Sequence, residues 1–235
     1  MLEVKDVSKK YGKLMANNHL SFTLEDGMVG ILLGPNGAGK STIFKSIAGL
    51  LRYEGEITIA GYVNKTSEAR AALGFVPEIP AMYPNLTVEE HLDFIARAYR
   101  LKDYEERKEA LLRRFELDDK RRKFGDELSK GMQQKLSICC ALLTDPKLII
   151  LDEPLVGLDP HAIKELKKTF EELKAQGTTV LISTHMIESV DMIWDKAFIL
   201  YRGELLATLT KSDLDREGVS LEDKFFELTE GGSEE

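Results

Sequence analysis

One eight-residue segment limits the possible folds of this chain more than any other. Residues 34–41 read Gly-Pro-Asn-Gly-Ala-Gly-Lys-Ser and match the pattern G-x-x-x-x-G-K-[ST]. A nearly continuous apolar run, Met28–Leu33, precedes them, and apolar residues at helical spacing follow from Ser41. A buried strand, a glycine-rich turn and a helix are therefore predicted in direct succession. The backbone N–H groups and the helix dipole of such a turn suit an anion.

The side chains of this segment add the chemistry of a bound nucleotide. Lys40 supplies a point charge for β- and γ-phosphates, and the Ser41 hydroxyl is suited to Mg²⁺. The alternative is a merely glycine-rich turn, but chance yields this pattern in roughly 1% of chains of this length. The segment alone is compatible with kinases, GTPases, motors, recombinases and transporter ATPases, so other residues must decide.

A second apolar strand, Leu148–Leu151, ends in the two acids Asp152 and Glu153. A carboxylate at the carboxyl end of a strand, as at Asp152, suits Mg²⁺ directly or through water. Glu153 beside it is suited to polarise an attacking water molecule. The alternative is a strand that ends at a solvated acidic turn, and the nearby phosphate loop makes that the minority interpretation.

The length, charge, hydropathy and cysteine content of the chain argue against several classes of protein. The chain has 235 residues, a net charge of −8 and a sequence pI near 5.2, which suits one α/β domain and argues against a nucleic-acid partner. No apolar run is long enough for a membrane span, and the N-terminus lacks the apolar stretch of a signal peptide. The adjacent Cys139 and Cys140 favour helix packing in a reducing compartment over a disulfide framework. We therefore expect a cytosolic chain whose membrane partner, if any, is another chain.

Four further segments place the chain in a family. They resemble, in family order, the adenine-stacking aromatic, the LSGGQ signature, the D-loop and the H-loop of ATP-binding cassette (ABC) proteins. In this sequence they are Lys10-Tyr11-Gly12, Leu128–Gln134, Gly157-Leu158-Asp159-Pro160 and Ser183-Thr184-His185. With the phosphate loop and the acidic strand end, six motifs run from Tyr11 to His185, so the resemblance covers nearly the whole chain.

The resemblance implies an α/β fold with a P-loop NTPase (RecA-like) core. The core would have a mainly parallel sheet, an N-terminal antiparallel β subdomain and an inserted α-helical subdomain. Strand and helix patterns place the core at about 1–77 and 146–215 and the helical subdomain at about 78–145. A C-terminal helix is predicted at about 220–229, within one domain of residues 1–230, and a flexible tail at 231–235.

The resemblance also implies a role for each motif. ATP would lie between two subunits paired head to tail, with Glu153 as general base and His185 holding the γ-phosphate and positioning water. The residues expected to contact the nucleotide are Tyr11, Gly34, Asn36, Gly37, Gly39, Lys40, Ser41 and Thr42, and, across the dimer, Ser129, Lys130, Gly131 and Asp159. The expected cofactors are ATP and Mg²⁺, with Ser41, Asp152 and Glu78 as candidate metal ligands. Taken alone, Tyr11 could instead pack at a strand end, and His185 could be a hydrogen-bonded core histidine.

Two positions depart from the family pattern. Glu78 stands where the family has the Q-loop glutamine, so a carboxylate there could reach Mg²⁺ but adds negative charge near the γ-phosphate. In the signature, Lys130 and Met132 replace glycine and glutamine. These variants, together with Tyr83–Val88 and a helix near the C-terminus, resemble the ABC-2-type exporter group.

The segment from Glu78 to Leu86 carries apolar and aromatic side chains beside the Q-loop. In the family this region receives a helix of the membrane subunit, so we expect permease subunits to dock there. The alternative is a turn that packs on its own subdomain.

The sequence therefore predicts the ATP-hydrolysing subunit of a membrane ABC transporter, most consistent with an ABC-2-type exporter. It would act at the cytoplasmic face of the membrane with a second ATPase subunit, identical or different, and with separate permeases. An importer ATPase, a soluble non-transport ABC ATPase and a P-loop kinase remain the alternatives.

Overall fold

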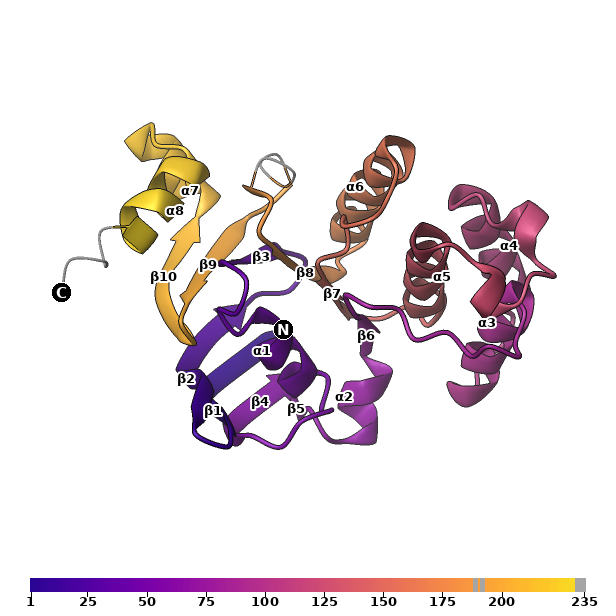
Figure 1. Cartoon of the computed structure of the whole chain (residues 1–235), viewed down its shortest axis with the longest axis horizontal. Helices are drawn as coiled ribbons and strands as arrows, with labels where there is room; N and C mark the ends of the chain where they lie inside the picture. Colours follow the sequence, from indigo (N-terminus) through magenta and orange to yellow (C-terminus); the bar gives the residue numbers. More distant parts are fainter. Residues whose placement is uncertain (188–189, 191–192, 231–235) are drawn as a thin grey trace.

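The computed structural model describes residues 1–187, 190 and 193–230. The tail predicted at 231–235 lies outside these residues. Figure 1 shows two sheets side by side, a group of helices at one end of the molecule, and two C-terminal helices at the other.

The first sheet is antiparallel throughout and comes from the N-terminal part of the chain. Its strand order is β2-β1-β4-β5, with β1 at Leu2–Tyr11, β2 at Leu14–Leu24, β4 at Glu54–Ile59 and β5 at Tyr62–Val63. Its long strands alternate buried apolar and exposed polar residues over much of their length, as one-sided sheets do. The predicted antiparallel subdomain is confirmed.

The second sheet is mainly parallel, as predicted. Its order is β10-β9-β3-β8-β7-β6, and β10 alone pairs antiparallel among its described strands. The strands are β3 (Val29–Leu33), β6 (Leu73–Val76), β7 (Leu148–Asp152), β8 (Thr179–Thr184), β9 (Lys196–Tyr201) and β10 (Glu204–Thr210). Every residue of β3, β7 and β8 is buried, which explains why their sequences are near-continuous apolar runs.

Eight α-helices are found among the described residues. They are α1 (Lys40–Ile47), α2 (Ser67–Ala71), α3 (Val88–Ala98), α4 (Glu105–Arg114), α5 (Lys130–Leu143), α6 (Pro160–Ala175), α7 (Lys211–Glu217) and α8 (Leu221–Glu230). Helices α3, α4 and α5 pack together at the right of Figure 1, away from the antiparallel sheet. None of the described helices is long and apolar enough to cross a bilayer.

Sequence signals at several helix ends have the expected geometry. The Thr87 hydroxyl accepts from the Glu90 N–H at 3.2 Å, and the Glu90 carboxylate accepts from the Thr87 N–H at 2.8 Å, which forms the capping box that the spacing Thr-x-x-Glu indicates at the start of α3. Gly177, with φ of 84°, follows the end of α6, where a left-handed glycine commonly terminates a helix. The short helices α2 and α7 were not predicted.

The parallel sheet separates two apolar cores. In β3, Ile31 and Leu33 face the core shared with α3–α6, whereas Leu32 faces the core shared with α1 and the antiparallel sheet. Alternate residues of β3 thus pack into the apolar cores on the two faces of the parallel sheet. The turn from β3 into α1 leaves this sandwich at the carboxyl edge of the sheet, where ligands of open α/β sheets bind.

Candidate functional site

A cavity of about 680 Å³ opens at the turn between β3 and α1. Residues of this turn from Asn36 to Thr42 line it, together with side chains from other elements, among them Tyr11, Glu78, Glu153 and His185. The structure therefore brings residues distant in sequence, from four predicted motifs and the Q-loop position, to one cavity large enough for a small-molecule ligand.

Two glycines of the loop are required by close contacts. A Cβ at Gly34 would lie 2.3 Å from the Leu200 carbonyl oxygen, and one at Gly39 would lie 2.3 Å from that of Ala16. Gly39 also has φ of 102°, which favours glycine. The loop can pass between β9 and β2 into α1 because these positions carry no side chain.

Lys40 is buried at the start of α1 and its ammonium group lies within the loop. Its Nζ donates to the carbonyl of Gly34 at 2.7 Å and lies 3.4 Å from Glu153 Oε1. A buried cation at a helix N-terminus, held by carbonyls and one carboxylate, creates a positive site suited to phosphate.

Glu153 directly follows β7 in a strained backbone conformation. Its φ is 48°, which is uncommon for a residue with a side chain, and its side chain is only 7% exposed. Oε2 lies 3.0 Å from Nδ1 of His185, the residue that follows β8. The buried carboxylate thus lies between the loop cation and a histidine that is 45% exposed. This arrangement places a potential proton acceptor at the phosphate end of the cavity.

Asp152 and Ser183 form hydrogen bonds next to Glu153 at the phosphate end of the cavity. The Ser183 hydroxyl donates to Asp152 Oδ1 at 2.6 Å and accepts from the Glu153 N–H at 2.9 Å. Asp152 is buried and does not line the cavity. The serine of the H-loop motif therefore joins β8 to both acids at the end of β7.

Tyr11 belongs to an apolar part of the cavity wall, here called the apolar end, with its sequence neighbours Leu14 and Met15. Its ring is 46% exposed, so it does not pack as a buried strand end, and Lys9 Nζ lies 4.9 Å from the ring centroid. Leu14 and Met15, also exposed, complete this end. An aromatic and two aliphatic side chains around an open slot suit the flat face of a base.

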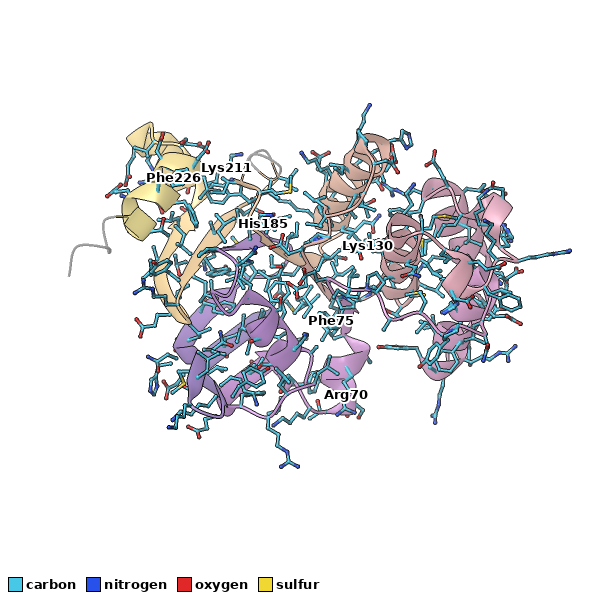
Figure 2. The ribbon with its side chains drawn as sticks, in the orientation of Figure 1. Arg70, Phe75, Lys130, His185, Lys211 and Phe226 are labelled. Atoms are coloured by element: carbon cyan, nitrogen blue, oxygen red, sulfur yellow. The ribbon has the colours of Figure 1, made fainter. Side chains whose placement is uncertain are left out.

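The predicted signature and D-loop residues lie outside this cavity. Ser129 caps α5 by accepting from the Met132 N–H at 3.3 Å, and Asp159 caps α6 by accepting from the Ala162 N–H at 2.9 Å. Lys130 is the first residue of α5, and Figure 2 shows it at a different place from His185. The hydrogen bond from Ala162 and the nearby ammonium of Lys135 hold the pKa of Asp159 below its usual value.

A donor set for Mg²⁺ is present at the phosphate end. Ser41 and Glu78 line the cavity, and Asp152 lies beneath it. No cluster of three His, Cys, Asp or Glu residues occurs among the described positions. Mg²⁺ is usually held by one or two carboxylates together with phosphates and water, so these donors fit an ion that arrives with a nucleotide.

A second hollow, of about 640 Å³, lies between the core and the helical segment. Its walls include Met82, Tyr83, Phe94 and Tyr99, with Tyr83 55% exposed and its ring centroid 5.4 Å from that of Phe94. Figure 2 shows Phe75 and Arg70 on its core side. The segment 78–86 therefore borders an apolar hollow and presents an exposed aromatic side chain.

Two residues at or beside the cavity were not predicted. Asn17, fully buried, donates from Nδ2 to the Gly39 carbonyl at 3.1 Å and so fixes the loop to β2. Arg202, in the turn between β9 and β10, lines the apolar end. No local signal distinguished Asn17, because Asn18 and His19 follow it in β2, and Arg202 belongs to none of the six motifs.

Comparisons with known proteins agree with this geometry. A family model described as "ABC transporter" matches residues 17–156. The ABC-type transporter ATP-binding protein EcsA of Bacillus subtilis is 38% identical over 238 residues, covering 97% of this chain and 96% of that protein. A Nod factor export ATP-binding protein I of Sinorhizobium fredii is 38% identical, covering 86% of this chain and 60% of that protein.

Solved structures show the same fold. The ATP-binding subunit of an ABC transporter has a TM-score of 0.92 and 40% identity, covering 97% of this chain and 99% of that one. A dimeric structure of a bacterial ABC transporter cassette has a TM-score of 0.82 and 27% identity, covering 89% of this chain and 98% of that one.

Proposed function

The chain belongs to the ABC transporter family as an ATP-binding subunit, and from that premise we propose that it hydrolyses MgATP to drive export through separate permease chains. The observation that carries the proposal is the single cavity that joins the phosphate loop, Tyr11, Glu153 and His185. The name of the relative that exports Nod factor supports export over import.

The proposed reaction transfers the γ-phosphoryl group of ATP to water. The Glu153 carboxylate takes a proton from the water, whose oxygen bonds to the γ-phosphorus while the bond from that phosphorus to the oxygen of ADP breaks. His185 holds the γ-phosphate and Lys40 offsets its charge. The 3.0 Å contact between His185 and Glu153 supports this pairing of roles.

When bound, Mg²⁺ would supply positive charge that offsets the charge of the phosphates. We propose Ser41 and Asp152 as the residues of this chain that orient it, and Glu78 as a third candidate. The Ser183 hydroxyl fixes the orientation of the Asp152 carboxylate, which is buried next to Glu153 of the cavity wall.

A second ATPase subunit would complete the site. Ser129, Lys130, Gly131 and Asp159 lie outside this chain's own cavity, and the residues of the signature begin helix α5. They are proposed to contact nucleotide held by the partner, as the likeness to a dimeric cassette supports. The dimer would close on ATP and open after hydrolysis.

The permease is proposed to dock beside residues 78–86, where the apolar hollow lies. Exposed aromatic side chains next to a hollow suit the apolar face of a helix. Docking would hold the chain at the cytoplasmic face of the membrane and connect closure of the nucleotide site to the transported substrate.

Phosphate release from the purified chain tests the enzymatic part. We expect MgATP to yield ADP and inorganic phosphate without any acceptor, and Glu153→Gln to bind ATP but release phosphate at least about 100-fold more slowly. Glu171→Gln, which changes an exposed glutamate on α6, is the matched control. Phosphate release by Glu153→Gln at the original rate would remove Glu153 as the base.

Recovery of partners tests the transporter part. The Glu153→Gln chain, tagged and incubated with MgATP and solubilised membranes of its source cell, should retain a multi-spanning permease. Recovery of soluble proteins alone would favour a non-transport ABC ATPase.

A further inference from the structure

The turn between β9 and β10 places an arginine at the apolar end of the nucleotide cavity. Tyr201 and Glu204 pair across the two strands, so the turn consists of Arg202 and Gly203. A Cβ at Gly203 would lie 2.9 Å from the carbonyl oxygen of Ala16, so the turn packs closely against β2 next to Met15. Arg202 therefore lines the cavity next to Met15 of the apolar end and beside the phosphate loop.

The backbone of this turn is one that arginine does not favour. The φ angles of Arg202 and Gly203 are 48° and 83°, so both residues are left-handed, as in type I′ hairpin turns. The first position of such a turn is usually Asn, Asp or Gly because a longer side chain adds steric cost. An arginine in this position suggests that its side chain has a use.

Hydrogen bonds fix the turn relative to the phosphate loop. The Gly203 N–H donates to the carbonyl of Ala38 at 3.0 Å, and the Gly203 carbonyl accepts from the Asn18 N–H at 2.8 Å. The Arg202 guanidinium carbon lies 5.1 Å from the centroid of the Tyr201 ring, which supports one side of the group. The turn thus presents a cation at a fixed distance from the loop.

The charged side chains that line the cavity also favour a ligand-binding role for Arg202. Among the described residues that line it, the permanent cations are Lys40 and Arg202, and the carboxylates are Glu78 and Glu153. Lys40 is already paired with Glu153, whereas Arg202 makes no ion pair with a described residue. Its donors are therefore free for hydrogen-bond acceptors of a ligand.

We propose that Arg202 binds the nucleoside end of ATP, donating to acceptor atoms of the ribose and base and holding the base against Tyr11. This inference rests on the proposed function and adds a substrate-binding residue to it. Because ATP and ADP share the nucleoside end, Arg202 stabilises both to the same degree. Lys40, in contrast, acts on the phosphates.

Nucleotide binding by Arg202→Asn tests the proposal. Asparagine is favoured at this turn position, so the variant removes the cation without weakening the hairpin. We expect Kd for MgATP and MgADP to rise by the same factor, about tenfold, as for loss of one charge-assisted hydrogen bond. KM for ATP should rise more than kcat falls. Magnesium tripolyphosphate, which lacks a nucleoside, should bind both proteins equally.

Two further variants make the result specific. Arg202→Lys keeps a cation and should retain part of the affinity. Arg100→Asn removes an exposed arginine that also has a left-handed φ, of 55°, but lies outside the cavity, and it should bind nucleotide like the original protein. It therefore controls for both charge and backbone relief.

The possible failures are distinguishable. Unchanged Kd for ATP and ADP in Arg202→Asn would overturn the inference, and so would an equal loss of tripolyphosphate binding, which would place Arg202 at the phosphates. If Lys40→Ala loses ATP while Arg202→Asn does not, the proposed function stands and this inference alone fails. If the original protein binds no ATP, the proposed function fails.

Discussion

At the scale of single residues, the phosphate end of the cavity depends on charges that are buried together. Lys40 is 6% exposed and Glu153 is 7% exposed, and each has the other as a close opposite charge. Removing one partner of such a pair leaves the other in a low-dielectric site without compensation. A substitution of either residue is therefore expected to affect both the stability of the site and its chemistry.

Lys40→Ala should lose nucleotide binding. The ammonium group is the buried cation of the loop, and alanine would leave the phosphates facing Glu153 without it. We expect Kd for MgATP to rise by at least about 100-fold, measured by titration calorimetry. Lys45→Ala, which removes an exposed lysine from the same helix α1, should bind normally. Original affinity in Lys40→Ala would count against the phosphate-loop assignment.

At this scale, sequence reasoning selected residues that the structure brings together where each belongs to a motif. The loop residues, Glu153 and His185 were predicted and the cavity contains them, because their chemistry requires particular residue types at particular spacings. Asn17 and Arg202 were missed because their importance comes from tertiary contacts with the loop, which spacing along the chain does not encode.

At the scale of elements, helix α1 depends on a side chain from a distant segment. Asn64 is 1% exposed; its Nδ2 donates to the carbonyls of Ser46 at 2.7 Å and Ile47 at 3.0 Å, and its Oδ1 accepts from the Tyr53 hydroxyl at 2.6 Å. Carbonyls in the last turn of a helix have no partner within the helix. Because α1 has only eight residues, it needs such support from outside.

Asn64→Leu should therefore destabilise the protein. Leucine has a comparable size but removes the amide, so the Ile47 carbonyl and the Tyr53 hydroxyl lose this partner and the Ser46 carbonyl retains the Gly49 N–H at 3.0 Å. We expect the free energy of unfolding to fall by about 2–3 kcal/mol in urea titrations. Asn85→Ala, which changes an exposed asparagine, should alter it by no more than about 0.5 kcal/mol. Equal stability of the two variants would show that Asn64 does not support α1.

The cysteines of α5 should be chemically quiet. Burial raises the pKa of the Cys140 thiol to about 12 and that of Cys139 well above its usual value. Since the thiolate is the reactive form, neither should react appreciably with Ellman's reagent at pH 8 in the folded protein. Both should react in guanidinium chloride, which is the internal control. Rapid reaction of the folded chain would contradict a packing role for these residues.

Elements were predicted best where burial or capping leaves a strong local pattern. The fully buried strands β3, β7 and β8 and the capped helix α3 were all indicated by sequence. The helices α2 and α7, of five and seven residues, are too short for apolar periodicity to stand out. Their caps, Thr66 and Thr210, were the available local signal.

At the scale of the whole molecule, the nucleotide cavity and the apolar hollow lie in different parts of the fold. The nucleotide cavity is formed by the core, whereas the apolar hollow lies between the core and the helical segment. Glu78 lines the first and Tyr83 the second. Only five positions along the chain separate Glu78 from Tyr83, so the proposed closure on the nucleotide would have a short route to the proposed docking site.

Tyr83→Ala should weaken permease binding and leave ATP hydrolysis unchanged. The 55% exposed ring is proposed to contact the permease and does not line the nucleotide cavity. We expect permease recovery from solubilised membranes to fall while basal phosphate release continues. Tyr62→Ala removes a comparably exposed tyrosine from the antiparallel sheet and should retain the permease. Full recovery with Tyr83→Ala would mean that the hollow is not the docking site.

Dimerisation provides a test of the signature residues that preserves the fold of each subunit. Ser129 caps α5, and aspartate is an equally good cap, so Ser129→Asp keeps the helix while adding a negative charge where the partner's γ-phosphate is proposed to lie. In the Glu153→Gln background with MgATP, light scattering should detect a dimer that Ser129→Asp abolishes. Ser220→Asp makes the same exchange at the serine whose hydroxyl accepts from the Asp223 N–H in the first turn of α8, and should leave the dimer intact. A dimer that persists in Ser129→Asp would show that the signature does not face the partner's nucleotide.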